Sequence, residues 1–287
     1  MRKYFFIFRY KVVLLPMIFE CSHIFMNKIL YAFAVVAAFT SCASSYNVQG
    51  SSSVSALDGN MLYLKAVKGG EVRNIDSCDV VHGEFHFAGL LDTIRMANLF
   101  MDDESIMPIV LEEGEITIKI DDAIQSVGGT PLNDSLYKFI DKHNQLSNRM
   151  NELSHRQSQM LLDGVDEEVI NQKLSIEASQ IAQEEDELVT KFIVDNFDNV
   201  LGPGVFMMIT SQYRYPILTP QIEDIMSKAT RRFKEDPYVK DYYKTAQENE
   251  ARMNGLEEVA EPQQRPVVPD TLTTPQLTTP LTNVPQQ

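Results

Sequence analysis

Hydrophobic and polar residues alternate in short runs between residues 46 and 129. The clearest runs are 62–64, 81–87 and 116–120, in which every second side chain is apolar. Side chains of a strand point to opposite faces in turn, so this period predicts half-buried β-strands. Glycine-containing breaks such as 68–70 predict the turns between them.

From residue 130 the apolar spacing changes to alternating steps of three and four residues, which indicates a long amphipathic helix. Thr130 before Pro131 predicts a capping hydroxyl and a first-turn proline, and Asp163-Gly164 interrupts the pattern. A second apolar stripe covers 166–197. Each stripe needs a partner, so the two helices are expected to pair as an antiparallel hairpin.

Three shorter helices are predicted after Gly202-Pro203-Gly204, over 205–213, 220–233 and 237–254. The final residues are rich in proline, threonine and glutamine and have few large apolar side chains, which is typical of a disordered segment.

The chain is therefore expected to be an α+β protein. An antiparallel β-sandwich or open barrel is predicted over 46–129, followed by an α-helical domain with the long hairpin over 130–255. A disordered Pro/Thr/Gln-rich tail is predicted over 256–287.

The segment 26–41 has a basic residue, Lys28, near its start, continues with an apolar run too short to span a bilayer, and ends in small residues before Cys42. This order resembles a bacterial lipoprotein signal, whose cysteine becomes the lipidated first residue of the mature chain. Residues 42–45 would then be the lipidated start and a linker, and 1–25 would reflect a start codon assigned too early. An ordinary secretory signal with an incidental cysteine is the alternative.

The charge is strongly acidic, with 25 basic and 40 acidic side chains and a net charge of −15. Without residues 1–41 the count becomes 20 basic and 39 acidic, a net charge of −19. Nucleic acid requires clustered lysine and arginine, so it is not an expected partner.

Cysteine usage limits the chemistry further. If Cys42 is lipidated, Cys78 is the only free thiol of the mature chain, and the sequence contains no Cys-x-x-Cys motif. A dithiol redox centre and a multi-cysteine zinc site are therefore excluded within one chain. Cys78 is expected to be a small packed side chain in a strand, with a reactive thiol as the alternative.

Other motifs predict no catalytic residue and no cofactor. His82, Glu84 and His86 alternate on a predicted strand and would share one face, where they are weak candidates for a metal site. A polar solvent-facing surface requires the same alternation, and it is the favoured interpretation. No nucleophile elbow, phosphate-binding glycine loop or dinucleotide fingerprint occurs, so an enzyme is not expected.

One modification site is predicted in the tail. Asp270-Thr271-Leu272 has the acid-hydroxyl-apolar pattern used for O-glycosylation of exported proteins in some bacteria, which makes Thr271 a candidate acceptor.

Five segments in the predicted strands and at the helix entry carry a family resemblance. They are 46–50, 62–64, 76–89, 113–118 and 129–133. Together they resemble the domain of unknown function that lies N-terminal to the thioredoxin-like module in TlpA-like thiol-disulfide lipoproteins of Bacteroides-type bacteria. The resemblance extends over about 46–255. It implies a following thioredoxin-like module with a Trp-Cys-x-x-Cys centre, but this chain has no tryptophan, so that redox activity is not implied here.

The expected function is that of a cell-envelope lipoprotein in a Gram-negative bacterium, on the periplasm-facing outer membrane. It would contact the membrane through its lipid and act as a non-catalytic binding or scaffolding module for an envelope protein that the sequence does not identify. The alternative is an accessory to periplasmic thiol-disulfide exchange that works with a separate thioredoxin-like protein.

Overall fold

The computed structural model describes residues 44–68 and 71–255. The predicted signal peptide, Cys42, the tail and Thr271 lie outside these residues.

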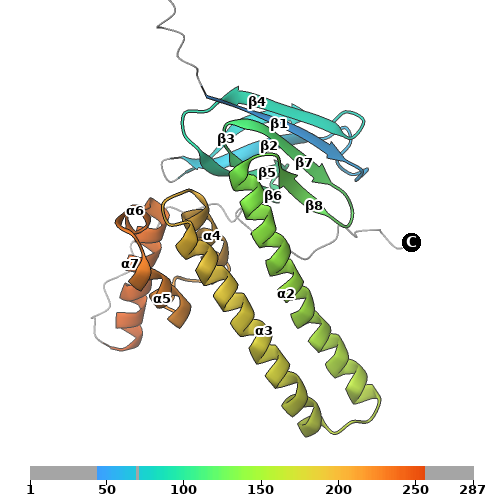
Figure 1. Cartoon of the computed structure of the whole chain (residues 1–287), viewed down its shortest axis with the longest axis vertical. Helices are drawn as coiled ribbons and strands as arrows, with labels where there is room; N and C mark the ends of the chain where they lie inside the picture. Colours follow the sequence, from blue (N-terminus) through green and yellow to red (C-terminus); the bar gives the residue numbers. More distant parts are fainter. Residues whose placement is uncertain (1–43, 69–70, 256–287) are drawn as a thin grey trace, which may run out of the picture. The chain divides into compact units, whose positions relative to one another are not determined.

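Within the described ranges, eight strands form two four-stranded sheets that pack face to face (Figure 1). In spatial order, the first sheet contains β4 (Glu84–Leu90), β1 (Ser45–Ser52), β7 (Gly114–Ile120) and β8 (Gln125–Gly128). The second sheet contains, again in spatial order, β3 (Glu71–Asp79), β2 (Met61–Lys68), β5 (Arg95–Met101) and β6 (Glu104–Leu111). The predicted sandwich is confirmed. One pair departs from the antiparallel expectation, because β1 and β7 run parallel.

The alternating pattern explains the inner faces of the sandwich. Val48 on β1 and Ile116 and Ile118 on β7 are fully buried, and Leu64 on β2 is buried in the same core. His82 is an exception to the predicted strand. It has a φ of 54° in the turn that precedes β4, so it does not continue the alternation of that strand.

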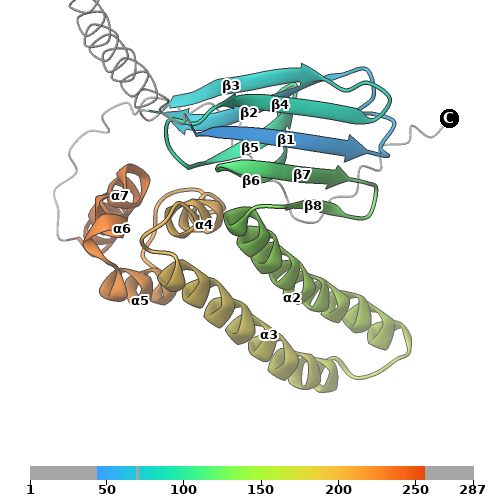
Figure 2. The same ribbon diagram turned by 45° about the horizontal axis from the view of Figure 1, so that its top comes forward.

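Helices make up the rest of the described chain. They are α2 (Pro131–Leu162), α3 (Glu167–Asp195), α4 (Leu201–Thr210), α5 (Pro220–Lys228), α6 (Arg231–Glu235) and α7 (Pro237–Met253). The helices α2 and α3 form the predicted antiparallel hairpin, whose far end lies away from the sandwich (Figure 2). With 32 residues, α2 is about 48 Å long at 1.5 Å per residue.

Two of the shorter helices differ from the sequence prediction. Helix α4 begins at Leu201, so Gly202-Pro203-Gly204 lies inside its first turns instead of preceding it. Proline is tolerated there because the first N–H groups of a helix need no intrahelical partner, and a side chain on Gly204 would collide with Met96 of β5. The predicted helix 220–233 divides into α5 and α6 because Ala229 has an extended backbone, with ψ at 134°.

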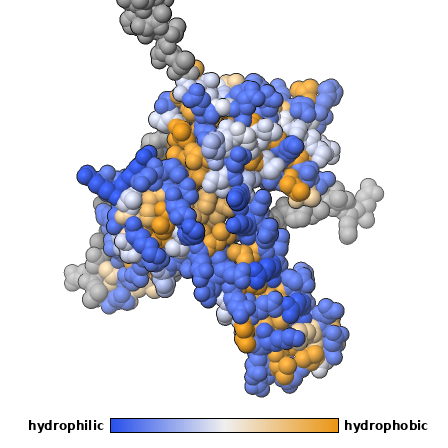
Figure 3. Space-filling model, viewed as in Figure 1, coloured by the Kyte–Doolittle hydropathy of each residue, from blue (hydrophilic) through white to orange (hydrophobic). Residues whose placement is uncertain are grey.

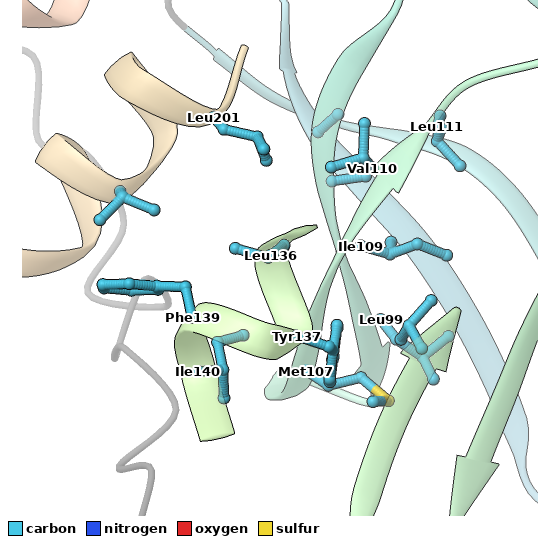
Figure 4. Close-up of a cluster of buried hydrophobic side chains, with 14 of the residues drawn as sticks. Leu99, Met107, Ile109, Val110, Leu111, Leu136, Tyr137, Phe139, Ile140 and Leu201 are labelled. Carbon is cyan, nitrogen blue, oxygen red and sulfur yellow. The ribbon is translucent and has the colours of Figure 1, made fainter. Parts of the chain in front are cut away.

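The main hydrophobic core continues from the sandwich into the helices. Leu136, Tyr137 and Ile140 of α2 belong to the same cluster as Val110 of β6 and Leu201 of α4 (Figure 4). A separate small cluster fills the distal half of the hairpin. Its buried members are Leu146, Leu153, Ile170, Leu174 and Ile181.

Asn133 of α2 closes the open edge of β6. The Val110 amide N–H donates to Asn133 Oδ1 over 2.9 Å, and Asn133 Nδ2 donates to the Val110 carbonyl over 2.8 Å. The side-chain amide thus replaces a neighbouring strand at this position. Asn133 is fully buried, so it removes an unpaired edge that would otherwise cost stability.

Glu112 caps the start of α2. Its Oε1 accepts hydrogen bonds from the N–H groups of Leu132 (2.8 Å) and Asn133 (3.1 Å), and the residue is 5% exposed. A carboxylate at this end is favourable because the first N–H groups carry partial positive charge. The prediction that the Thr130 hydroxyl caps this helix is wrong, since that oxygen accepts from Asn133 Nδ2 instead.

Replacing Asn133 by alanine is expected to destabilise the fold by about 2 to 4 kcal/mol, because the buried N–H and C=O of Val110 lose their partners. Urea unfolding followed by circular dichroism measures this. The matched control is Asn151→Ala, an exposed site on the same helix, which should change the free energy of unfolding by less than about 0.5 kcal/mol. Equal effects of the two substitutions would contradict the role of Asn133.

Candidate functional site

The three residues considered for a metal site do not form one. His82 lies in the turn, whereas His86 on β4 is 2.6 Å from Asn47 Oδ1 through its Nε2. In the part of the chain that the structure describes, no three His, Cys, Asp or Glu side chains lie close enough together to hold a metal ion.

Cys78 is half-buried on β3 beside the core of the sandwich, as expected for a packed cysteine. Burial raises the pKa of its thiol, and the nearby Asp76 and Asp79 carboxylates add to that rise. The thiolate is the reactive form of cysteine, so these surroundings disfavour nucleophilic or redox chemistry at this residue.

An open groove of about 530 Å³ runs along the hairpin. Its lining residues are Gln145, Asn148, Arg149, Glu152, Arg156 and Glu177. Each arginine already has a carboxylate partner on α3, because Arg149 contacts Glu184 at 2.5 Å and Arg156 contacts Glu177 at 2.8 Å. These pairs connect α2 to α3 across a solvent-exposed surface and leave little uncompensated charge for a ligand.

A further polar contact between the two helices lies nearer the sandwich. His143 Nε2 is 2.9 Å from Glu185 Oε1, and the hydrogen bond from this histidine lowers the pKa of Glu185. The contact connects α2 and α3 close to Phe139 and Phe192, whose rings stack at 4.4 Å. The proximal hairpin is therefore held by both aromatic and polar contacts.

The distal end of the hairpin exposes apolar side chains. Leu161 and Leu162 at the end of α2 are 49% and 89% exposed, and Val169 and Ile176 on α3 are 53% and 64% exposed. We call these four residues the tip cluster. Four large aliphatic side chains exposed within sixteen residues are a feature of contact surfaces.

The loop 211–219 between α4 and α5 presents a second exposed surface. Tyr213 and Tyr215 are 38% and 53% exposed, and Arg214 between them is exposed as well. We call these three residues the tyrosine surface. It was not identified from the sequence; the only available signal was an arginine between two tyrosines outside any periodic pattern.

Contacts with α7 hold this loop in place. The Tyr242 hydroxyl accepts from the Ile217 N–H at 3.2 Å and donates to the Ile217 carbonyl at 3.1 Å. Asn249 Nδ2 donates to the Pro216 carbonyl over 2.8 Å. Burial raises the pKa of Tyr242, so its hydroxyl keeps the proton that the second hydrogen bond requires.

Aromatic side chains pack α4 against α6 and α7, next to this loop. Phe206 of α4 makes edge-to-face contacts with Tyr242 at 5.5 Å and with Phe233 at 5.6 Å. Thr210, the last residue of α4, lies 3.0 Å from the Tyr238 hydroxyl through its own hydroxyl. Helix α4, which precedes the loop, is thus packed against α7, and a loop with a fixed end loses less entropy when a ligand binds.

Comparison with known protein families identifies part of the chain. Residues 46–136 match the family described as Domain of unknown function (DUF4369), which confirms the resemblance for this region. The matched region contains the sandwich except for Ser45, the first residue of β1, and ends in α2, so it includes Glu112 and Asn133. No curated protein and no solved structure matches the chain. None of the helices in the described ranges is both long enough and apolar enough to cross a bilayer.

Replacing Tyr242 by phenylalanine is expected to loosen the loop, because the Ile217 N–H and carbonyl lose their shared partner. Hydrogen–deuterium exchange of peptides covering 211–219 should become about tenfold faster, the change that corresponds to losing about 1.4 kcal/mol of local stability. The adjacent, half-buried Tyr243→Phe is the control and should leave this exchange unchanged. Identical exchange in both variants would show that the hydroxyl does not hold the loop.

Proposed function

We propose that this protein is a lipid-anchored lipoprotein of the Gram-negative cell envelope, attached through Cys42 to the periplasm-facing outer membrane. In this proposal it acts as a non-catalytic binding or scaffolding module, and the hairpin of α2 and α3 supplies the contact with a partner protein.

The observation that carries the proposal is the tip cluster. Its side chains lie toward the end of an arm about 48 Å long, estimated from the rise of an α-helix, and they are not members of the small core inside that arm. Exposed leucine and isoleucine cost solubility and contribute nothing to the stability of the main core. The surface of Figure 3 shows apolar residues at this distal end, next to hydrophilic ones.

Other features of the described residues agree with binding rather than catalysis. The arginines of the hairpin groove are neutralised by Glu184 and Glu177, and the half-buried Cys78 has a raised pKa. The net charge of −15 disfavours nucleic acid as the partner. A protein surface with apolar side chains fits the tip cluster better.

The proposed anchor lies close to the sandwich along the chain. The Ser44 carbonyl accepts from the Leu91 N–H at 2.8 Å, which fixes the start of β1. Only Ala43 lies between Cys42 and Ser44, so the two Cα–Cα steps between them span at most about 7 Å. Acyl chains on Cys42 would then hold the sandwich near the bilayer, with the hairpin free to reach a partner.

In-cell photo-crosslinking tests this function. With p-benzoylphenylalanine at position 162 or 176 of the full-length protein, we expect a discrete crosslinked product in the membrane fraction. The matched control is position 124, where Ile124 is 62% exposed on the sandwich. In a Cys42→Ala background the product should fall at least about tenfold, because anchoring concentrates both proteins at one surface.

The outcomes separate the alternatives. Equal products from positions 124 and 176, or none from the hairpin, would contradict the role of the tip cluster. If the Cys42→Ala protein stays in the membrane fraction, or if alkynyl palmitate does not label the protein, the proposed anchor is contradicted. A crosslinked partner with a Cys-x-x-Cys centre would favour the alternative function, in which this protein is an accessory to periplasmic thiol-disulfide exchange.

A further inference from the structure

The tyrosine surface has the chemistry that binds extended, proline-rich chains. Proline-rich segments in the polyproline II conformation pack their rings against exposed aromatic side chains, and they lose little entropy because they are already extended. Tyr213 and Tyr215 offer two such rings on a loop held by Tyr242 and Asn249. Such a surface does not need to rearrange to accept a ligand.

The same chain contains a segment of matching composition. Residues 256–287 include six of the chain's 13 prolines. Among them, Pro266-Val267-Val268-Pro269 places two prolines three residues apart. Polyproline II has three residues per turn, so Pro266 and Pro269 would project from one face of that helix. This is the spacing that aromatic-lined sites recognise.

The position of the chain end makes this segment a local ligand. Asn249 of α7 bonds the loop at Pro216, and the described chain ends six residues later at Gly255. Ten residues, 256–265, then lie between Gly255 and Pro266, and the eleven Cα–Cα steps across them span up to about 36 Å when extended. A tether of this length keeps the proline segment at an effective concentration on the order of 1 mM beside the loop.

Charge agrees with the same assignment. Arg214 is exposed and has no ion-pair partner among the residues that the structure describes. The segment 256–287 carries four acidic side chains and one basic one, and Asp270 directly follows Pro269. An arginine between two tyrosines can therefore pair with a carboxylate while the tyrosine rings hold the prolines.

We propose that the tyrosine surface binds the proline-rich segment 256–287 of its own chain, with Pro266 and Pro269 against Tyr213 and Tyr215 and Arg214 paired with Asp270. This inference does not depend on the proposed lipid anchor or on the tip cluster. It assigns to the C-terminal segment a defined place on the helical part of the protein.

Photo-crosslinking of the purified full chain tests the proposal. With p-benzoylphenylalanine at the exposed position 212, beside the intact tyrosine surface, we expect crosslinks to residues 262–270. Replacing both Tyr213 and Tyr215 by serine removes the rings that bind the prolines and should reduce the yield of these crosslinks about tenfold. The tether keeps the segment near the loop in the variant, so the loss is not complete. Both side chains are exposed, and circular dichroism confirms that the variant folds.

Proline substitutions test the assigned register. Pro266→Ala with Pro269→Ala should reduce the crosslink to the same extent, whereas Pro280→Ala with Pro285→Ala, the matched control, should not. An equal mixture of ¹⁴N- and ¹⁵N-labelled protein should yield crosslinks within one isotope only. Crosslinks between isotopes, insensitivity to the first proline pair, or products that contain no residue of 256–287 would overturn the proposal.

Discussion

The edge of β6 must be closed, and this requirement determines how the helical part joins the sandwich. A strand edge exposes backbone groups that need partners, and here the side chain of Asn133 supplies them. Glu112 anchors the same turn of α2 by accepting two of its N–H groups. Together the two side chains fix where α2 begins, and the direction of the hairpin follows from that position.

This junction divides the helical part into two regions with different roles. Near the sandwich, α2 and α4 continue its hydrophobic core, and the loop 211–219 is hydrogen-bonded to Tyr242 and Asn249 of α7. Farther along, the hairpin relies on a small core and on the ion pairs of Arg149 and Arg156. The distal end is thus stable enough to persist as an arm, yet it leaves the tip cluster exposed.

The sequence predicted features that depend on local periodicity. Alternating residues such as Ile116 and Ile118 identified the strands, and the three-to-four spacing identified both long helices. Features that depend on distant contacts were missed, including the parallel pairing of β1 with β7, the cap by Glu112 twenty residues before Leu132, and the loop bonded by Tyr242. The predictions for Cys42 and Thr271 remain untested, since both lie outside the described residues.

The central claim is that the junction at Asn133 makes the hairpin a rigid extension of the sandwich. Spin labels at Glu84→Cys and Gln159→Cys, with the other cysteines replaced by serine, give the distance between sandwich and distal hairpin by pulsed electron paramagnetic resonance. The account predicts one narrow distance distribution that broadens when Asn133 is replaced by alanine. A distribution that is broad from the start, and unchanged by that substitution, would contradict it.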